Sequence, residues 1–258
     1  MGDIISKDQM GSTIELPKTP SSIVSLVPSQ TELLFDLGLK SEVKGITKFC
    51  IHPADEVRDV KKIGGTKNFN FSKIDELNPD LVIGNKEENY KEGIEQLREK
   101  YPVWMSDIYT LNDSLDMINS VASLVGRAEK GKEIIEDIKS GFESIKKKAP
   151  LKVLYFIWQK PYMVAGGGTF IDIMLSQIGL DNVAPKDRYP ELSPDDIRAI
   201  NPDLILLSSE PYPFKAKHFS DFSALCPNAK IHIVDGEMFS WYGSRLRKAP
   251  AYFNSLSF

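Results

Sequence analysis

One short phrase occurs twice in this chain. Asn-Pro-Asp-Leu followed by aliphatic residues begins at Asn78 and again at Asn201. The aliphatic runs in the two copies, 81–83 and 204–207, suit strands that are buried on both faces of a parallel sheet. Because proline disfavours helical geometry in the residue before it, each copy predicts the end of a helix and the start of a buried strand. The repetition therefore predicts two related α/β halves.

The segments before both copies carry helix start signals. Ser193 is followed by a proline and two acidic residues, a combination typical of the first turn of a helix. In the first copy, Ser72 stands three residues before Asp75 and takes the corresponding place. We therefore expect a short helix directly before each buried strand.

A second pair of segments supports the repeat. Residues 22–39 predict a strand, a Pro-Ser turn and a helix, and residues 152–180 follow the same plan with a longer loop. Serine or threonine three residues before an acid predicts a capped helix start, and glycine predicts a left-handed helix end. The predicted starts are Ser29 with Glu32 and Thr169 with Asp172, and the predicted ends are Gly38 and Gly179.

The segment that joins the halves predicts a long helix. Ile134, Ile138 and Ile145 recur there at helical spacing. A helix over 128–148 would have roughly 21 residues and a length of about 30 Å. We therefore predict an α/β fold of two related α/β lobes joined by a single long backbone helix, which would act as a stiff strut if it packed on both lobes. The predicted parts are an N-terminal segment 1–20, an N-terminal lobe 21–111, connecting helices 112–149 and a C-terminal lobe 150–258.

Composition excludes several classes of protein. The 258 residues carry a net charge of −4, which gives no bulk basic field for nucleic acid. No apolar run approaches the ~18 residues that predict a membrane span. The first twenty residues show no apolar core of a signal peptide, so we expect either a cytosolic protein or a chain that begins after a removed leader. The two cysteines, Cys50 and Cys226, fit neither a disulfide scaffold nor a zinc motif.

The ligand-binding residues are expected in the loops after the strands. In open α/β sheets, ligands bind outside the carboxyl ends of the strands, and two lobes that face each other would form a cleft there. These loops are rich in aromatic residues, which suit a large planar ligand but which could instead fill the lobe cores. The candidate ligand-binding residues are Pro28, Ser29, Phe49, His52, Trp158, Tyr162, Trp241, Tyr242 and Arg245.

Three of these features allow two interpretations each. His52 could coordinate the iron or cobalt of a ligand, or it could be an ordinary hydrogen-bonded side chain. Arg245 could pair with a carboxylate or phosphate of the ligand, or it could form a structural salt bridge. The three glycines 166–168 before a helix could cradle a phosphate, but they lack both phosphate-binding registers, which favours a tight turn. We see no Ser/His/Asp set and no Gly-x-Ser-x-Gly, so we predict no enzymatic activity.

At this point a family resemblance becomes clear. The segments that carry it are IVSLVPSQTELLFDLGL, IGGTKNFNFSKIDELNPDLVI, MVAGGGTFIDIMLSQIGLDNVAP and LSPDDIRAINPDLIL. Over about residues 20–250 the chain resembles the periplasmic binding proteins of cobalamin and iron–siderophore ABC importers. The resemblance implies two lobes joined by one backbone helix, with little closure on binding. It also implies that the loop containing Phe49 and His52 faces the ligand.

The resemblance further implies a docking surface for a membrane subunit. In such importers an acidic residue on each lobe, in the first turn of the helix before the repeated phrase, meets arginines of the transporter. The second lobe offers Asp195 with Asp196 beside it. The first lobe has Ser72 where the family leads us to expect a glutamate, so Ser72 is the matching but altered position.

We therefore expect a monomeric substrate-binding protein without an intrinsic cofactor. Its ligand is a cobalt or iron chelate, with cobalamin or another corrinoid first and an iron–siderophore or haem next. It would deliver this ligand to an ABC importer in the periplasm or at the cell surface. One alternative is a cytosolic corrinoid or haem carrier or sensor without a transporter. A second is an enzyme of a related metal-cluster fold, which would need bridging cysteines where the sequence offers only Cys50.

Overall fold

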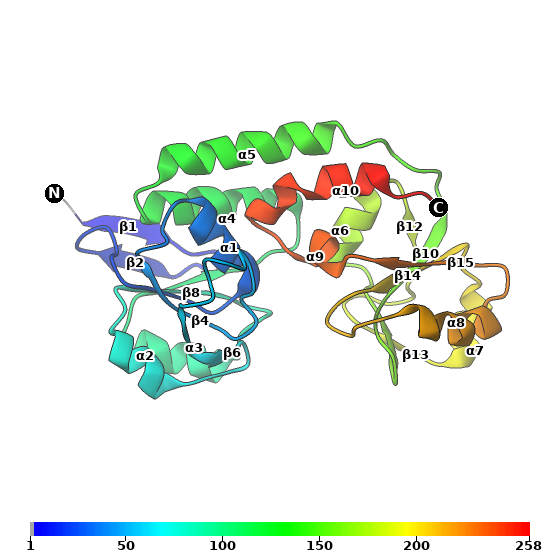
Figure 1. Ribbon diagram of the computed structural model, residues 1–258, viewed down its shortest axis with the longest axis horizontal. Coiled ribbons are helices and arrows are strands. Elements are labelled where there is room, and N and C mark those ends of the chain that lie inside the picture. Colours follow the sequence, from blue (N-terminus) through cyan, green and yellow to red (C-terminus); the bar gives the residue numbers. More distant parts are fainter. Residues whose placement is uncertain (1–2) are drawn as a thin grey trace. The chain divides into compact units, whose positions relative to one another are not determined.

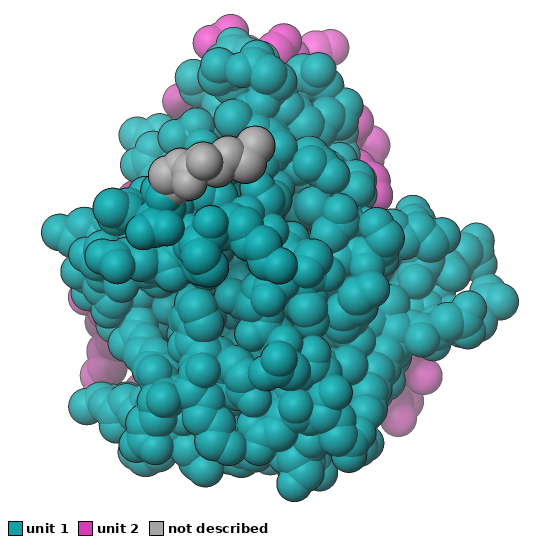
Figure 2. Space-filling model, turned by 90° about the vertical axis from the view of Figure 1, so that its left-hand side faces the viewer, with its two compact units in different colours: residues 1–108, 112–139, 242–247 teal, residues 109–111, 140–241, 248–258 magenta. Residues whose placement is uncertain are grey.

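The computed structural model describes residues 3–258, which form two compact units. The first unit contains residues up to Ile108 together with Asn112–Lys139 and Tyr242–Arg247, and the second contains Tyr109–Leu111, Ser140–Trp241 and Lys248–Phe258 (Figure 2). Nothing in the sequence pattern signals the return of residues 242–247 to the first unit. Each unit has its own central β-sheet with helices packed around it, as the repeat predicts.

The first unit is built on a five-stranded parallel sheet in the order β5-β4-β3-β8-β9. Helices α2 and α3 lie on one side of this sheet and α4 on the other (Figure 1). Two small antiparallel pairs, β1 with β2 and β6 with β7, complete the unit. The strands are β1 (Ile4–Lys7), β2 (Thr13–Leu16), β3 (Ile23–Ser25), β4 (Val43–Ile46), β5 (Lys61–Lys62), β6 (Gly64–Gly65), β7 (Asn68–Phe69), β8 (Leu81–Asn85) and β9 (Val103–Ser106). The helices are α1 (Pro28–Asp36), α2 (Phe71–Leu77), α3 (Lys91–Arg98), α4 (Leu111–Leu124) and the 3₁₀ turn η2 (Ser244–Arg247).

The second unit has a mixed sheet in the order β13-β11-β10-β14-β15, with β12 paired to β10. Strands β10, β14 and β15 are parallel, whereas β11 runs antiparallel to β10. The strands are β10 (Lys152–Trp158), β11 (Tyr162–Val164), β12 (Asp181–Asn182), β13 (Glu191–Leu192), β14 (Leu204–Ser208) and β15 (Lys230–Val234). The helices are α6 (Phe170–Gln177), α7 (Pro194–Ile200), η1 (Ala216–His218), α8 (Phe219–Leu225), α9 (Gly236–Ser240) and α10 (Ala249–Ser255).

The repeated phrase has the same structure in both units. Its asparagine ends the preceding helix in the left-handed conformation, with φ 40° at Asn78 and 47° at Asn201. Its aspartate accepts backbone hydrogen bonds from residues at or just before the start of the adjacent parallel strand. Asp80 Oδ2 accepts hydrogen bonds from the backbone N–H groups of residues 21 and 22, and Asp203 Oδ2 accepts one from the N–H of Lys152. The phrase therefore recurs because it makes the helix-to-strand turn beside a central strand.

The predicted helix ends are confirmed, and so are two of the predicted starts. Gly38 and Gly179 have φ of 81° and 87° at the ends of α1 and α6. Thr169 Oγ1 accepts the N–H of Asp172, and Ser193 forms a reciprocal capping box with Asp196 at the start of α7.

The other two predicted starts are wrong. The residue at the start of α1 is Val27, without a side-chain cap, and Glu32 is engaged by Arg245 instead of by the backbone. Helix α2 is capped by Asn70, whose side chain accepts the N–H of Lys73, so Ser72 lies inside the first turn. The predicted serine is displaced because Asn70, two residues earlier, already accepts the free N–H of Lys73 in the first turn.

The predicted long helix is shorter than expected. Helix α5 (Ala128–Glu143) is continuous, and the division between the units falls within it, after Lys139. After Ile145, whose N–H still donates to the carbonyl of Phe142, the amides of Lys146 and Lys148 take partners elsewhere in the second unit. The N–H of Lys146 donates to the side chain of Asn254 at 2.8 Å, and that of Lys148 donates to the carbonyl of residue 178 at 2.7 Å. Ile134 and Ile138 are buried as predicted, whereas Ile145 lies after the end of the helix.

Within residues 3–258, no helix is both long and apolar enough to cross a bilayer.

Candidate functional site

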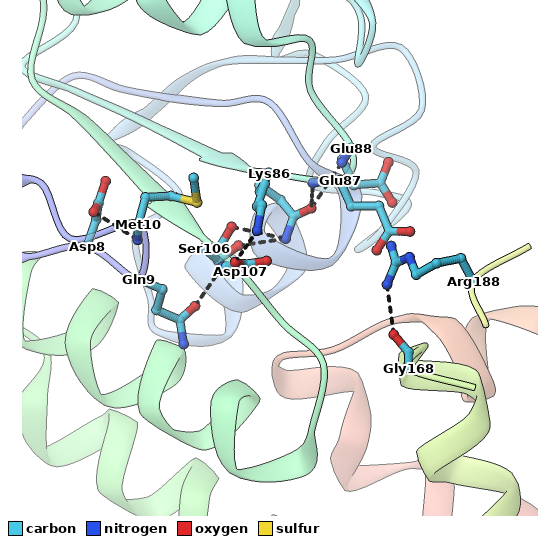
Figure 3. Close-up of polar contacts among 11 residues, drawn as sticks. Asp8, Gln9, Met10, Lys86, Glu87, Glu88, Ser106, Asp107, Gly168 and Arg188 are labelled. Atoms are coloured by element: carbon cyan, nitrogen blue, oxygen red, sulfur yellow. Dashed lines mark hydrogen bonds and ion pairs between the residues drawn. The ribbon is translucent and has the colours of Figure 1, made fainter. Parts of the chain in front are cut away.

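The carboxyl edge of the first unit's sheet is lined with hydrogen-bonded polar groups. The side chain of Asn85, at the end of β8, donates to Ser106 Oγ at 3.0 Å and accepts from the N–H groups of Glu87 and Glu88. Gln30, in the first turn of α1, donates to the same serine oxygen at 2.6 Å. Nearby, Lys86 pairs with the carboxylate of the residue after Ser106 at 2.6 Å (Figure 3). These contacts hold the loop after β8 firmly against the end of β9.

Tyr242 completes this edge from a distant part of the sequence. Its buried hydroxyl lies against the hydroxyls of Ser29 and Ser106, and burial raises the pKa of this phenol well above its usual value. Burial also raises the pKa of the Glu88 carboxyl, and the Lys67 ammonium opposes that shift. The edge therefore offers neutral hydroxyl and amide groups. Two of the predicted residues, Ser29 and Tyr242, are brought together here.

The loop after β4 presents two apolar side chains to solvent. Cys50 points inward, where its sulfur lies 3.1 Å from Thr31 Oγ1 and 3.2 Å from Thr47 Oγ1. Its neighbours Phe49 and Ile51 are both 51% exposed, and the Lys48 ammonium lies 5.0 Å from the Phe49 ring centroid. Because the Cys50 side chain is held between two threonines, the exposed Phe49 ring next to it is well placed to contact an apolar ligand face.

The other two predicted residues of the first unit lie at the same edge of the sheet. His52 is half-buried in the loop that contains Phe49, and Pro28 is the half-buried first residue of α1. Across residues 3–258, no group of three or more His, Cys, Asp or Glu side chains is arranged to hold a metal ion.

Arg245 is engaged in a buried structural ion pair. Its Nε and one terminal nitrogen donate to the two carboxylate oxygens of Glu32 at 2.7 and 2.9 Å. Both side chains are at most 5% exposed. The structure therefore shows the salt-bridge interpretation of Arg245, and pairing with a ligand stays a prediction.

In the second unit, the carboxyl end of β10 carries an exposed tryptophan. Trp158 is the last residue of β10 and is 40% exposed. Its ring meets the ring of Tyr212 edge-on, with centroids 5.4 Å apart. Tyr212 and the buried Gln159 lie in the loops where the sequence predicts ligand-binding residues, whereas the buried His218 beside them was assigned no role. Their signal in the sequence was only the cluster of aromatic residues after the second copy of the phrase.

The other aromatic candidates of the second unit are packed against protein groups. Tyr162 contacts the rings of Phe156 and Phe222. Trp241 is buried, and its indole N–H donates to a carboxylate oxygen of Glu210 at 2.8 Å. The core-filling interpretation fits these contacts better than a fully ligand-facing one.

The three glycines 166–168 pack against another backbone segment. The N–H of Gly166 donates to the carbonyl of Arg188, and the N–H of Arg188 donates back to Gly167. The Arg188 guanidinium donates to the Gly168 carbonyl at 2.7 Å (Figure 3). A Cβ at Gly166 would overlap the carbonyl oxygen of Lys186. The tight-turn interpretation therefore holds, because close approach of two backbones requires glycine there.

The proposed docking residues lie on the surface but differ between the units. The Asp195 side chain is 93% exposed and pairs with Arg198, three residues on. Asp196 is exposed and serves as the capping partner of Ser193. Ser72 is exposed in the first turn of α2.

A pocket of about 500 Å³ lies between α4 and α5 of the first unit. Charged and amide side chains dominate its lining, with two aliphatic residues among them. The lining residues are Asn112, Leu115, Asp116, Asn119, Lys132, Ile135, Glu136 and Lys139.

Comparison with known proteins identifies the family. The model of the family described as periplasmic binding protein matches residues 23–222. The chain therefore belongs to the periplasmic binding protein family. Members of this family are substrate-binding proteins of ABC transporters and not enzymes, in agreement with the prediction from sequence.

Three similar proteins illustrate the family. The chain is 27% identical to an uncharacterized ABC transporter substrate-binding lipoprotein, YvrC, of Bacillus subtilis (strain 168), over 93% of this chain and 80% of the relative. It is 24% identical to a vitamin B12-binding protein of Vibrio campbellii, over 72% of this chain and 70% of the relative. Its fold resembles the periplasmic heme-binding protein RhuT from Roseiflexus sp. RS-1, with a TM-score of 0.72, 22% identity, and coverage of 91% of this chain and 98% of that one.

Proposed function

We propose that this protein binds a cobalt or iron chelate, with cobalamin or another corrinoid as the first candidate, and delivers it to the membrane subunit of an ABC importer. The observation that carries the proposal is the exposure of two aromatic rings, that of Trp158 at the end of β10 and that of Phe49 in the loop after β4. A flat macrocycle needs apolar area, and exposed aromatic rings supply it. The similarity to a vitamin B12-binding protein supports the same ligand class.

The polar groups of the first unit favour a corrinoid over haem. The hydroxyls of Ser29 and Tyr242 are neutral hydrogen-bonding groups, which suit the neutral amides that surround a corrin ring. Haem carries two propionates, which call for cations, and the buried guanidinium of Arg245 is already matched by Glu32. An iron–siderophore and haem are therefore the second choices.

Calorimetric titration of the whole chain with cyanocobalamin, haemin and ferrioxamine B tests the ligand class. The proposal expects cyanocobalamin to bind most tightly. Tighter binding of haemin or of the ferric siderophore would reassign the ligand, and no binding of any of the three would refute the proposal.

His52 remains the proposed axial ligand for a metal with an open coordination position. The test is the absorption spectrum of bound haemin or of diaquacobinamide in the wild type and in His52→Ala. A changed spectrum supports coordination, and an identical spectrum removes it.

Asp195 carries the proposed contact with the transporter, together with Asp196. Charge reversal at an exposed contact acts on association and leaves a distant ligand site untouched. Asp195→Arg should abolish uptake in cells and keep the affinity for cyanocobalamin. Asp55→Arg is the matched control, because Asp55 is also 93% exposed and paired three residues on with an arginine. Normal uptake by Asp195→Arg would favour the alternative of a cytosolic carrier or sensor without a transporter.

We also propose that α5 limits hinge motion and that the protein acts as a monomer in the periplasm or at the cell surface. The continuity of Ala128–Glu143 across the division of the units supports the limited hinge motion. Small-angle scattering with and without cyanocobalamin should give nearly superimposable curves. A marked fall in the radius of gyration on binding would contradict a stiff linker.

A further inference from the structure

The exposed Trp158 ring packs edge-on against the ring of Tyr212. Its edge-on partner Tyr212 belongs to the loop after β14, far away in the sequence. Tyr212 in turn packs edge-on against Phe214, with ring centroids 4.7 Å apart. An exposed tryptophan at a strand end has several rotamers open to it, and each ordered neighbour reduces that freedom. What fixes Tyr212 therefore bears on the orientation of Trp158.

Two partly buried hydrogen bonds fix the hydroxyl of Tyr212. Its hydroxyl lies 3.2 Å from Gln159 Oε1 and 3.4 Å from His218 Nε2. Gln159 and His218 are both buried. The Gln159 amide donates to Asp221 Oδ2 at 2.8 Å, and His218 Nδ1 accepts the N–H of Lys215 at 2.8 Å.

These contacts allow one consistent direction of donation. Because Nδ1 of His218 accepts a backbone N–H, the proton of the neutral imidazole lies on Nε2, which then donates to the Tyr212 oxygen. The Tyr212 hydroxyl donates to Gln159 Oε1, and the Gln159 amide donates to the Asp221 carboxylate. A chain that ends on a carboxylate strengthens its own links, since each donor polarises the next.

We infer that Gln159, Tyr212 and His218 are positioning residues that hold Trp158 as a fixed aromatic platform for the ligand. Gln159 directly follows Trp158 in the sequence. The same hydrogen bonds therefore restrain both the backbone next to Trp158 and the Tyr212 ring that its indole contacts. The role in ligand binding rests on the proposed function, whereas the fixed orientation of Trp158 does not. A pre-oriented ring loses less rotamer freedom on binding, which favours affinity.

Fluorine NMR of the protein labelled with 5-fluorotryptophan tests the orientation without ligand. The chain has three tryptophans, and Trp158→Phe assigns the resonance of interest. Tyr212→Phe removes only the hydroxyl, and we expect it to shift or broaden the Trp158 resonance while those of Trp104 and Trp241 stay in place. Tyr155→Phe is the matched control, because it removes a buried hydroxyl on β10 that bonds to Ser208 and takes no part in these hydrogen bonds.

Two substitutions of His218 separate positioning from general structural damage. The side chain of His218→Asn can replace Nδ1 as acceptor for Lys215 but cannot reach Tyr212, whereas that of His218→Gln places an amide donor near the former Nε2. We expect His218→Asn to perturb the Trp158 resonance and His218→Gln to restore it. An unperturbed Trp158 resonance in both Tyr212→Phe and His218→Asn would overturn the inference.

Affinity for cyanocobalamin provides the second readout. Tyr212→Phe and His218→Asn should each weaken binding by about three- to tenfold, and Tyr155→Phe should leave it unchanged. If the wild type binds no cyanocobalamin, the proposed ligand fails and the fluorine spectra still decide the positioning role. Perturbed spectra with wild-type affinity in both variants would overturn the role in binding.

Discussion

The starts of α1 and α6 occupy equivalent places in the repeat, yet they use their acidic residue differently. In the second unit, Thr169 caps α6, and Asp172 accepts a hydrogen bond from Asn182 at 2.8 Å. In the first unit, α1 has no side-chain cap, and Glu32 forms a buried ion pair with Arg245. The first unit has therefore exchanged a local cap for a contact that anchors the returning segment 242–247. The repeat keeps its turns and strands, whereas the residues that join distant segments differ.

The largest loss of stability is expected at Glu32, where the two helix starts differ. Glu32→Ala leaves the Arg245 guanidinium buried without its partner, which typically costs about 3–5 kcal/mol. Asp172→Ala removes one hydrogen-bond acceptor from a partly buried site and should cost about 1 kcal/mol. Urea unfolding of the two variants measures both free energies. Equal losses would show that the ion pair adds nothing beyond an ordinary hydrogen bond.

A smaller effect is expected at the aspartates of the repeated phrase. Asp80 Oδ2 accepts three hydrogen bonds from Ser21 and Ser22, whereas Asp203 Oδ2 accepts one from Lys152. Asp80→Asn should therefore lower the unfolding free energy by about 2 kcal/mol and Asp203→Asn by about 1 kcal/mol at neutral pH. The order of the two losses is checked by urea midpoints measured side by side.

The effect at Asp80 should also depend on pH. Burial opposes its charge, but the hydrogen bonds from Ser21 and Ser22 outweigh burial and lower the pKa of Asp80 in the folded state. A lowered folded-state pKa adds stability above the unfolded pKa of about 3.9, and this stability is lost as pH falls through the folded value. The difference in Tm between the wild type and Asp80→Asn should thus shrink between pH 5 and pH 2.5. A constant difference would exclude a contribution from the ionised carboxylate.

Local features were predictable from the sequence because they depend on neighbouring residues. The turn at Asn-Pro-Asp, the cap at Ser193 and the exits at Gly38 and Gly179 all use groups within a few positions of one another. The aliphatic run of β14 likewise predicts a buried strand, and all of its residues are buried.

Contacts between distant segments were not predictable in this way. Glu32 and Arg245 are separated by 213 positions. The local sequence pattern at Ser29 instead assigned Glu32 to a helix cap. The same limit hid the bonds from Gln159 to Tyr212 and Asp221, which join the end of one strand to the loop after another. Helix α5 ends early for a related reason, since Asn254 and residue 178 take its next amides.

The central claim is that the exposed rings at the strand ends bind the ligand, and calorimetry with cyanocobalamin tests it most directly. Trp158 retains on the order of 100 Å² of accessible surface, so covering part of it accounts for a tenfold effect, or about 1.4 kcal/mol. Trp158→Ala should weaken binding by about tenfold and Phe49→Ala by a few-fold. Ile5→Ala, which removes a 68% exposed side chain of the β1–β2 hairpin, should leave affinity unchanged. Wild-type affinity in both the Trp158 and the Phe49 variants would contradict the account and locate the ligand elsewhere.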